Sequence, residues 1–288
     1  MSNQNWRAHA CAFTVALAAA IALPAVAAES GQDARSEMQK LPWQVGPATG
    51  DVGSRSKIAI PDGARLLPES SGGKFLELTG NLPETGDTVL IRDHWWATLS
   101  FEESGYVKDD EKLDADELLA SLRKNDEASN QERTRRGMAT LTIDGWIVPP
   151  HYDPTTKYLE YGLRLRASDS PKPVVNYTMR LLSRHGYETV TLVTGPDTLD
   201  QDVKDLHQVL GGFNFNAGET YGEFRAGDHV AEFGLGALVL GGAAAADIKG
   251  GWFKGLIALL AAGWKVVVAG VVALGAGIKR LFTRSSDR

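Results

Sequence analysis

Five carboxylates crowd into residues 102–111, and their types and spacing come nearest in this sequence to a cation site. Hard cations such as Ca²⁺ are held by several oxygen atoms that converge on one point. The spacing matches no EF-hand loop, because the glycine and the closing glutamate are absent from their required offsets. Acidic residues also suit a solvated loop that leads into a helix, so we predict no metal and no cofactor here. The five are Glu102, Glu103, Asp109, Asp110 and Glu111.

The histidines are the other side chains that could bind a metal or act as a general base. The five beyond residue 28 show no His-x3-His or similar spacing of a metal site. His151, with Asp153 close by, could act as a general base. The pair Asp153-Pro154 favours a bend, however, and explains the same run without any chemistry. The five are His94, His151, His185, His207 and His229.

The sequence also lacks the motifs of several large enzyme classes. It contains no Gly-x-Ser-x-Gly elbow, no Walker loop and no dinucleotide-binding fingerprint. We therefore assign no catalytic, cofactor-binding or metal-ligating residue, and we favour a protein that is not an enzyme. An envelope enzyme that uses the carboxylate loop or His151 is the alternative.

Nine aromatic residues lie in strand-like runs and are expected to pack in a core. If some of them line a pocket, the body becomes a small-ligand or peptide-binding module. They are Trp95, Trp96, Trp146, Tyr158, Tyr161, Tyr177, Tyr187, Phe213 and Phe215.

The N-terminus has the three parts of a secretory signal peptide over residues 1–28. A short head with one positive charge precedes an apolar middle at 11–23, and small residues follow. The middle is too short to span a bilayer, so we expect cleavage before Ala28 or Glu29. Cys11, the only cysteine, lies in this segment. The mature chain is therefore expected to form no disulfide and no cysteine-based metal site.

Near the C-terminus, residues 255–278 form a stretch of 24 residues with a single charge, Lys265. A helix needs roughly 20 apolar residues to cross the hydrocarbon core, so this stretch is predicted to be a transmembrane helix. Lys265 at mid-helix costs about 2.5 to 3.5 kcal/mol on the insertion scale, which makes the span marginal. The lipid bilayer is thus the first partner that the sequence predicts.

Two features of this anchor leave alternatives open. Trp264 and Lys265 in its middle suggest either an interrupted helix or one that packs against a partner helix. A stripe of small residues, Ala269, Ala273 and Gly277, would allow self-association into a membrane assembly. The apolar run Phe233–Ala246 could also be the first half of a helical hairpin, although one pass is the better prediction.

Charge divides along the chain and predicts the orientation. Residues 29–246 carry 22 Lys and Arg against 34 Asp and Glu, a net charge of −12, whereas residues 247–288 carry a net charge of +5. Basic residues beside a span favour the cytoplasmic side. We therefore expect a single-pass protein of the bacterial inner membrane, with the tail at 279–288 inside and the acidic body in the periplasm or extracytoplasmic space. A body this acidic argues against nucleic acid as a partner.

The body, residues 29–228, is predicted to be one α+β domain with a mostly antiparallel sheet and two helices that cover one face. Pro149-Pro150 is taken as a connector between strands, and a Gly/Ala-rich segment at 229–254 leads to the membrane. The expected strands are 57–60, 88–91, 95–101, 141–148, 158–166, 174–182, 188–194 and 213–215, the last returning to the sheet, and the expected helices are 114–136 and 200–210.

Several separated motifs in order resemble the bacterial membrane-anchored family called domain of unknown function 2167. The resemblance covers nearly the whole mature chain and implies location and anchoring, with no assigned reaction. The fold is also similar, by analogy, to PsbP/Mog1-like folds. The motifs are 101–111 (FEESGYVKDDE), Asp114-Ala-Asp116, Gly145-Trp146, Pro150-His151-Tyr152-Asp153, Val175-Asn176-Tyr177 and Tyr221-Gly-Glu-Phe224.

Together these patterns predict a membrane-anchored extracytoplasmic protein whose body binds another component of the cell envelope. The sequence does not say which component, and it assigns no biochemical activity.

Overall fold

The computed structural model describes residues 34–81, 86–92 and 95–241. The predicted signal peptide, transmembrane helix and tail lie outside these residues, as does His94. Among the residues that the structure does describe, no helix combines the length and the apolar character needed to cross a bilayer.

Residues 34–40 are helical and belong to a first compact unit that ends at Lys40. The body begins at Leu41. Its elements are β1 (Gln44–Val45), β2 (Ala48–Val52), β3 (Ser56–Ile60), β4 (Ala64–Leu67), α2 (Glu69–Leu78), β5 (Thr88–Arg92), β6 (Trp95–Glu102), α3 (Ala115–Arg135), β7 (Leu141–Asp153), β8 (Tyr158–Ala167), β9 (Val174–Leu182), β10 (Tyr187–Thr194), α4 (Leu199–Leu210), β11 (Phe213–Phe215), the 3-10 helix η1 (Tyr221–Glu223) and α5 (Leu235–Val239).

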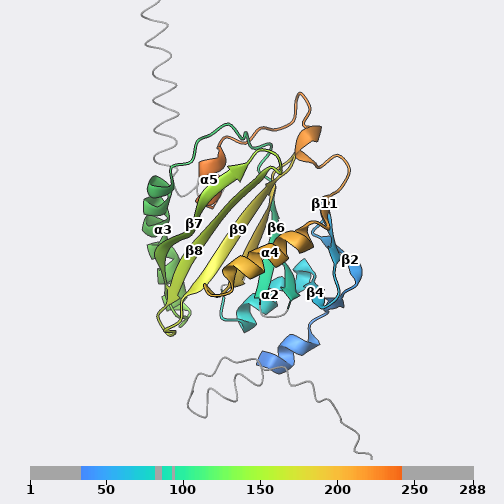
Figure 1. Cartoon of the computed structure of the whole chain (residues 1–288). Helices are drawn as coiled ribbons and strands as arrows, with labels where there is room; N and C mark the ends of the chain where they lie inside the picture. The colour runs from blue at the N-terminus through green and yellow to red at the C-terminus, as the bar shows by residue number, and fades with distance from the viewer. Residues whose placement is uncertain (1–33, 82–85, 93–94, 242–288) are drawn as a thin grey trace, which may run out of the picture. The chain divides into compact units, whose positions relative to one another are not determined.

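A large antiparallel sheet of eight strands forms the centre of the body, in the order β1-β4-β5-β6-β10-β9-β8-β7 (Figure 1). The predicted meander from β7 to β10 is confirmed, because each of these strands pairs antiparallel with the next along the chain. Short connectors explain this order, since a tight turn can only return the chain antiparallel. The α+β class with a mostly antiparallel sheet is therefore correct.

The prediction that Pro149-Pro150 connects two strands is wrong, because both prolines lie inside β7. β7 is an edge strand that pairs only with β8 in the described sheet. Proline has no N–H to donate, so a sheet tolerates it at an edge or at a bulge. The pairing register shifts between Val148 and His151, at the position of the prolines.

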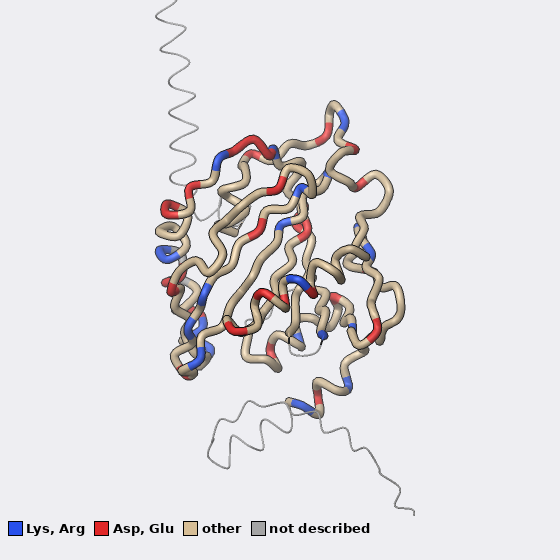
Figure 2. Tube along the Cα trace, viewed as in Figure 1, with Lys and Arg blue, Asp and Glu red and all other residues tan. Residues whose placement is uncertain are grey.

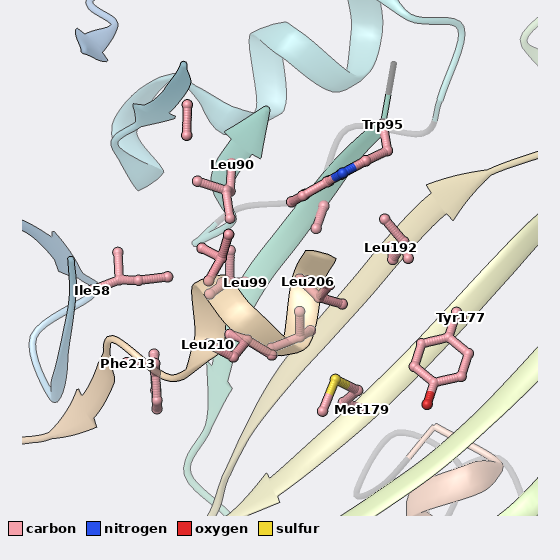
Figure 3. Close-up of a cluster of buried hydrophobic side chains, with 14 of the residues drawn as sticks. Ile58, Leu90, Trp95, Leu99, Tyr177, Met179, Leu192, Leu206, Leu210 and Phe213 are labelled. Carbon is pink, nitrogen blue, oxygen red and sulfur yellow. The ribbon is translucent and has the colours of Figure 1, made fainter. Parts of the chain in front are cut away.

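A second, three-stranded sheet contains β2, β3 and β11. The strand at 213–215 was expected to return to the main sheet, but it pairs with β3 instead, with Phe213 opposite Ile58. Phe213 thereby joins the buried cluster under α4, where Ile58 also lies (Figure 3).

Helices lie on both faces of the main sheet, which corrects the prediction that they cover one face. Val190 and Leu192 of β10 pack in a cluster with α4 and the small sheet. Tyr187 of the same strand packs in a second cluster with α3 and α5. Side chains alternate between the faces of a strand, so residues of opposite parity need cover on opposite sides. On the second face, Phe75 of α2 also lies edge-on to Trp96, with ring centroids 5.2 Å apart.

α3 was predicted from the sequence, and its ends follow from local chemistry. The Asp114 carboxylate accepts hydrogen bonds from the N–H groups of Asp116 and Glu117, which caps the first turn. Acidic residues lie in the first turn and basic residues in the last (Figure 2), the arrangement that the helix dipole favours.

The second cluster continues past residue 228 into the Gly/Ala-rich segment. Leu235 and Leu238 of α5 are 1% and 0% exposed, and Leu240 packs against the same cluster. The described part of the segment, which ends at Gly241, thus contributes to the core of the body. The division of the whole chain into the predicted segments stays a prediction.

Candidate functional site

The five carboxylates of the loop at 102–111 do not converge on one point. Glu103 forms an ion pair with Arg55 at 2.8 Å. Glu111 accepts a hydrogen bond from the Gly236 N–H at 2.9 Å, at the start of α5. In the part of the chain that the structure describes, no three His, Cys, Asp or Glu side chains are placed to hold a metal ion. The carboxylates of the loop therefore contact separate elements of the body.

Asp109 is the member of the loop with the closest polar contacts. Its carboxylate accepts hydrogen bonds from the Tyr152 hydroxyl at 2.6 Å and from the Lys157 ammonium at 2.9 Å. Burial raises the pKa of Asp109, but these two hydrogen bonds, together with Tyr221 and the charge of Lys157, outweigh it and hold the pKa below its ordinary value. Asp109 is thereby a charged anchor between the loop and the β7–β8 hairpin.

The structure brings two of the described histidines to one carboxylate, Glu160 of β8. His207 Nε2 of α4 lies 3.1 Å from Glu160 Oε2. His151 is directly opposite Glu160 in the β7–β8 register. The Tyr177 hydroxyl also donates a hydrogen bond to Glu160.

The pair of Glu160 and His207 has the electrostatics of an acid–base pair. The hydrogen bond from His207 to Glu160 raises the pKa of His207 above its ordinary value, against the opposing effect of burial. Burial raises the pKa of Glu160, but the hydrogen bonds from His207 and Tyr177 have the larger, opposite effect. The net pKa lies below its ordinary value, so the carboxylate stays ionised. Such a pair can hold a proton on the imidazole.

His185 and His229 take part in separate contacts, and His151 has a further one. His185 Nδ1 lies 3.0 Å from the Glu219 carboxylate. The His229 carbonyl accepts a hydrogen bond from the Tyr106 N–H at 2.8 Å. His151 Nδ1 is 3.2 Å from the carbonyl of Pro149. His151 and the carboxylate loop are therefore engaged in different contacts.

A cleft of about 850 Å³ lies on the second face of the main sheet. Its floor is built from three adjacent strands, β6, β10 and β9. Thr98 is opposite Thr191, and Val193 is opposite both Trp96 and Asn176, so these side chains share one face. The floor combines an indole and an aliphatic side chain with two hydroxyls and an amide.

Two helix ends form walls of the cleft, and Arg133 joins them. Arg133 is 7% exposed and lies in the last turn of α3. Its guanidinium donates to the carbonyl of Gly80, just beyond α2, at 3.3 Å and to the carbonyl of Ala139. The side chain of Asn130 connects the same end of α3 to β7 through two hydrogen bonds with the backbone of Leu141. These contacts join the helix ends that line the cleft to each other and to β7.

A family model described as "Protein of unknown function (DUF2167)" matches residues 44–275. The chain belongs to the DUF2167 family. No curated protein matches the sequence. Among solved structures, the DUF2167 domain is similar to cyanobacterial PsbP (CyanoP) from Synechocystis sp. PCC 6803, with 14% sequence identity and a TM-score of 0.33 over 60% of this chain and 98% of that chain.

Sequence reasoning found one residue of the cleft in the DUF2167 domain and missed the rest. Trp96 was among the aromatic residues that could line a pocket, and it does. Thr98 and Thr191 belong to none of the motifs, and Asn176 lies in the motif Val175-Asn176-Tyr177, which carried no assigned site role. The strand of Thr98, β6, is distant in the chain from β9 and β10. A usable signal was nevertheless present: each of these strands alternates polar and apolar residues, which predicts one polar face. Only the strand order could show that the three polar faces adjoin.

Proposed function

We propose that this protein is a membrane-anchored binding protein of the bacterial cell envelope, whose body takes a small amphipathic ligand in the cleft on the second sheet face. The single observation that supports the ligand-binding part of this proposal is the mixed lining of a cleft of about 850 Å³. Ligand sites of about 300 to 1,000 Å³ commonly combine apolar walls with a few polar groups that orient the ligand.

The lining indicates the chemistry of the ligand. Trp96 and Val193 offer an apolar surface for a flat or aliphatic portion. Thr98, Thr191 and Asn176 offer neutral donors and acceptors for hydroxyl or amide groups on the same ligand. Arg133 also lines the cleft but donates to backbone carbonyls of its walls. Asp87, which is buried, and Asp169, which is exposed, also line the cleft. The favoured ligand is therefore a molecule with one polar and one apolar side.

Photo-crosslinking tests this ligand site in the full-length chain in its own membrane. A photoreactive amino acid at Ser129, an exposed lining residue on α3, is expected to crosslink a small ligand, seen as a mass shift of the intact protein. The same amino acid at Lys204, exposed on α4 on the other sheet face, is the matched control. Asn176→Leu keeps the side-chain volume but removes the amide, and should weaken ligand retention about tenfold. Equal crosslinking at both positions would contradict the proposal.

The anchoring part of the proposal rests on the signal-like segment at 1–28, the apolar stretch at 255–278 and the basic tail at 279–288. A reporter that is active only in the cytoplasm should be active when fused after Arg288. A reporter active only in the periplasm should be inactive there and active when fused after Gly241. The reverse pattern would overturn the proposed orientation and leave the cleft to be tested separately.

A further inference from the structure

Glu188 of β10 is a buried carboxyl group with little hydrogen bonding. Glu188 is 0% exposed. Among the described residues, Oε1 has no hydrogen-bond partner. Oε2 lies 3.4 Å from the Ser56 hydroxyl, which also lies 2.9 Å from the carbonyl of Val52. A hydroxyl has one hydrogen, so it cannot serve both acceptors fully, and a buried polar atom without a partner is costly.

Glu188 forms part of the wall of a small cavity of about 220 Å³. The cavity lies where the β2–β3 hairpin and the start of α2 meet the main sheet. Leu99 and Phe101 supply apolar walls, and Glu69 contributes a second carboxylate. This cavity shares no lining residue with the cleft on the second sheet face.

Arg55 also lines the cavity, but its charge is already matched. Its guanidinium lies 2.8 Å from Glu103 and 2.8 Å from Glu219. It also lies over the Phe101 ring, 5.0 Å from the centroid. With Arg55 and Glu103 paired, the remaining ionisable side chains of the cavity are the acids Glu69 and Glu188.

We propose that this cavity binds the primary ammonium group of an amine, with Glu188 as the buried counter-ion and Glu69 at the opening. An ammonium has three hydrogen-bond donors, and Glu188 Oε1 is an acceptor without a donor partner among the described residues. Leu99 and Phe101 would pack against the methylene groups to which the ammonium is attached. A metal ion fits less well, because the described acids do not form a set of three ligands. The amine can be a free small molecule or the lysine side chain of a partner protein, which present the same group.

The charges around Glu188 make the binding depend on pH. Burial raises the pKa of Glu188 to about 8; the Ser56 hydrogen bond opposes this rise, and the charges of Asp87 and Glu69 add to it. The cationic side chain on this side, Arg55, is paired with Glu103 and Glu219. At pH 7 the empty cavity therefore holds a neutral carboxyl, and an ammonium that binds there displaces its proton. Affinity should increase as the pH rises from 6 to about 9, below the ordinary pKa of an alkylammonium near 10.4.

Calorimetric titration of the full-length chain in a neutral detergent tests the proposal. The probes are 1,5-diaminopentane, for a free amine, and Nα-acetyl-lysine-N-methylamide, for a lysine side chain. Titrations in two buffers that differ in heat of ionisation measure proton release, which is expected to be about one proton per site at pH 7. Tighter binding of the first probe indicates a free amine, and tighter binding of the second indicates a partner's lysine.

Matched variants separate the cavity from non-specific binding. Glu188→Gln should weaken the binding about ten- to hundredfold, because it removes a charge-assisted hydrogen bond. Ser54→Trp at the exposed rim and Glu69→Gln should weaken it as well, and they carry the test if Glu188→Gln fails to fold. Glu77→Gln, on the same helix as Glu69 but outside the cavity, should leave it unchanged. Saturable binding of neither probe, binding without proton release, or binding unaffected by the cavity variants would each overturn the proposal.

Discussion

Replacing Leu206 with alanine is expected to lower the free energy of unfolding by about 2 to 5 kcal/mol, the range for a buried leucine cut back to alanine. Leu206 is 0% exposed and lies on the inner face of α4. Figure 3 shows it among side chains of the main sheet, including Met179 and Leu192. The well-packed cluster cannot collapse fully around the missing methyl groups, so a cavity cost adds to the lost transfer free energy.

Denaturant unfolding of the full-length chain, followed by far-ultraviolet circular dichroism, measures this effect. Lys204→Ala is the control, because Lys204 is exposed on the same helix and its truncation should change the stability by no more than about 0.5 kcal/mol. If both variants lower the free energy of unfolding by the same small amount, α4 does not belong to the cooperative core of the body.

Glu188 should make the body less stable as the pH rises. Burial raises its pKa in the folded state to about 8, whereas the ordinary value is 4.5. Between these pH values the folded state keeps a proton that the unfolded state has lost, so stability decreases with rising pH. The slope approaches about 1.4 kcal/mol per pH unit, and the total reaches a few kcal/mol, at most about 4, by pH 8.

Comparison with Glu188→Gln isolates this contribution from the other titrating groups. The glutamine cannot ionise, so the stability of the variant relative to the wild type should increase from pH 5 to pH 8. Glu77→Gln, which changes an exposed carboxylate of α2, should keep the wild-type slope. Parallel pH profiles for the wild type and Glu188→Gln would show that the carboxyl is ionised in the folded state at neutral pH.

Local patterns in the sequence were sufficient to predict most of the strands and two of the helices. Alternation marks β8 and β9, and the Asp114 cap marks the start of α3, because these signals depend on neighbours along the chain. α2 was missed because its interior contains Gly72, a poor helix former. A Cβ at Gly72 would lie 1.9 Å from the carbonyl oxygen of Asp87, so the glycine that obscures the helix is what allows it to pack there.

The sites depended on contacts that no local pattern contains. Glu160 and His207 are 47 residues apart in the sequence, and helix packing brings them together. The polar residues of the cleft adjoin because β10 lies between β6 and β9. Glu188 has the parity of Val190 and Leu192, so alternation places it on their face of β10, but only the tertiary structure shows that it is buried beside Ser56 of β3.

The sequence by itself determined the family, the α+β class and the acidic character of the body, because these follow from composition, ordered motifs and short-range periodicity. It also carries the prediction of a signal peptide and an anchor, which are local properties of residues 1–28 and 255–278. Tertiary structure alone decided which strands adjoin, which sheet face each helix covers and which carboxyl is buried. The physical reason is that burial and charge are set by atoms distant in the chain, so the cleft and the Glu188 cavity exist only once the layers have packed.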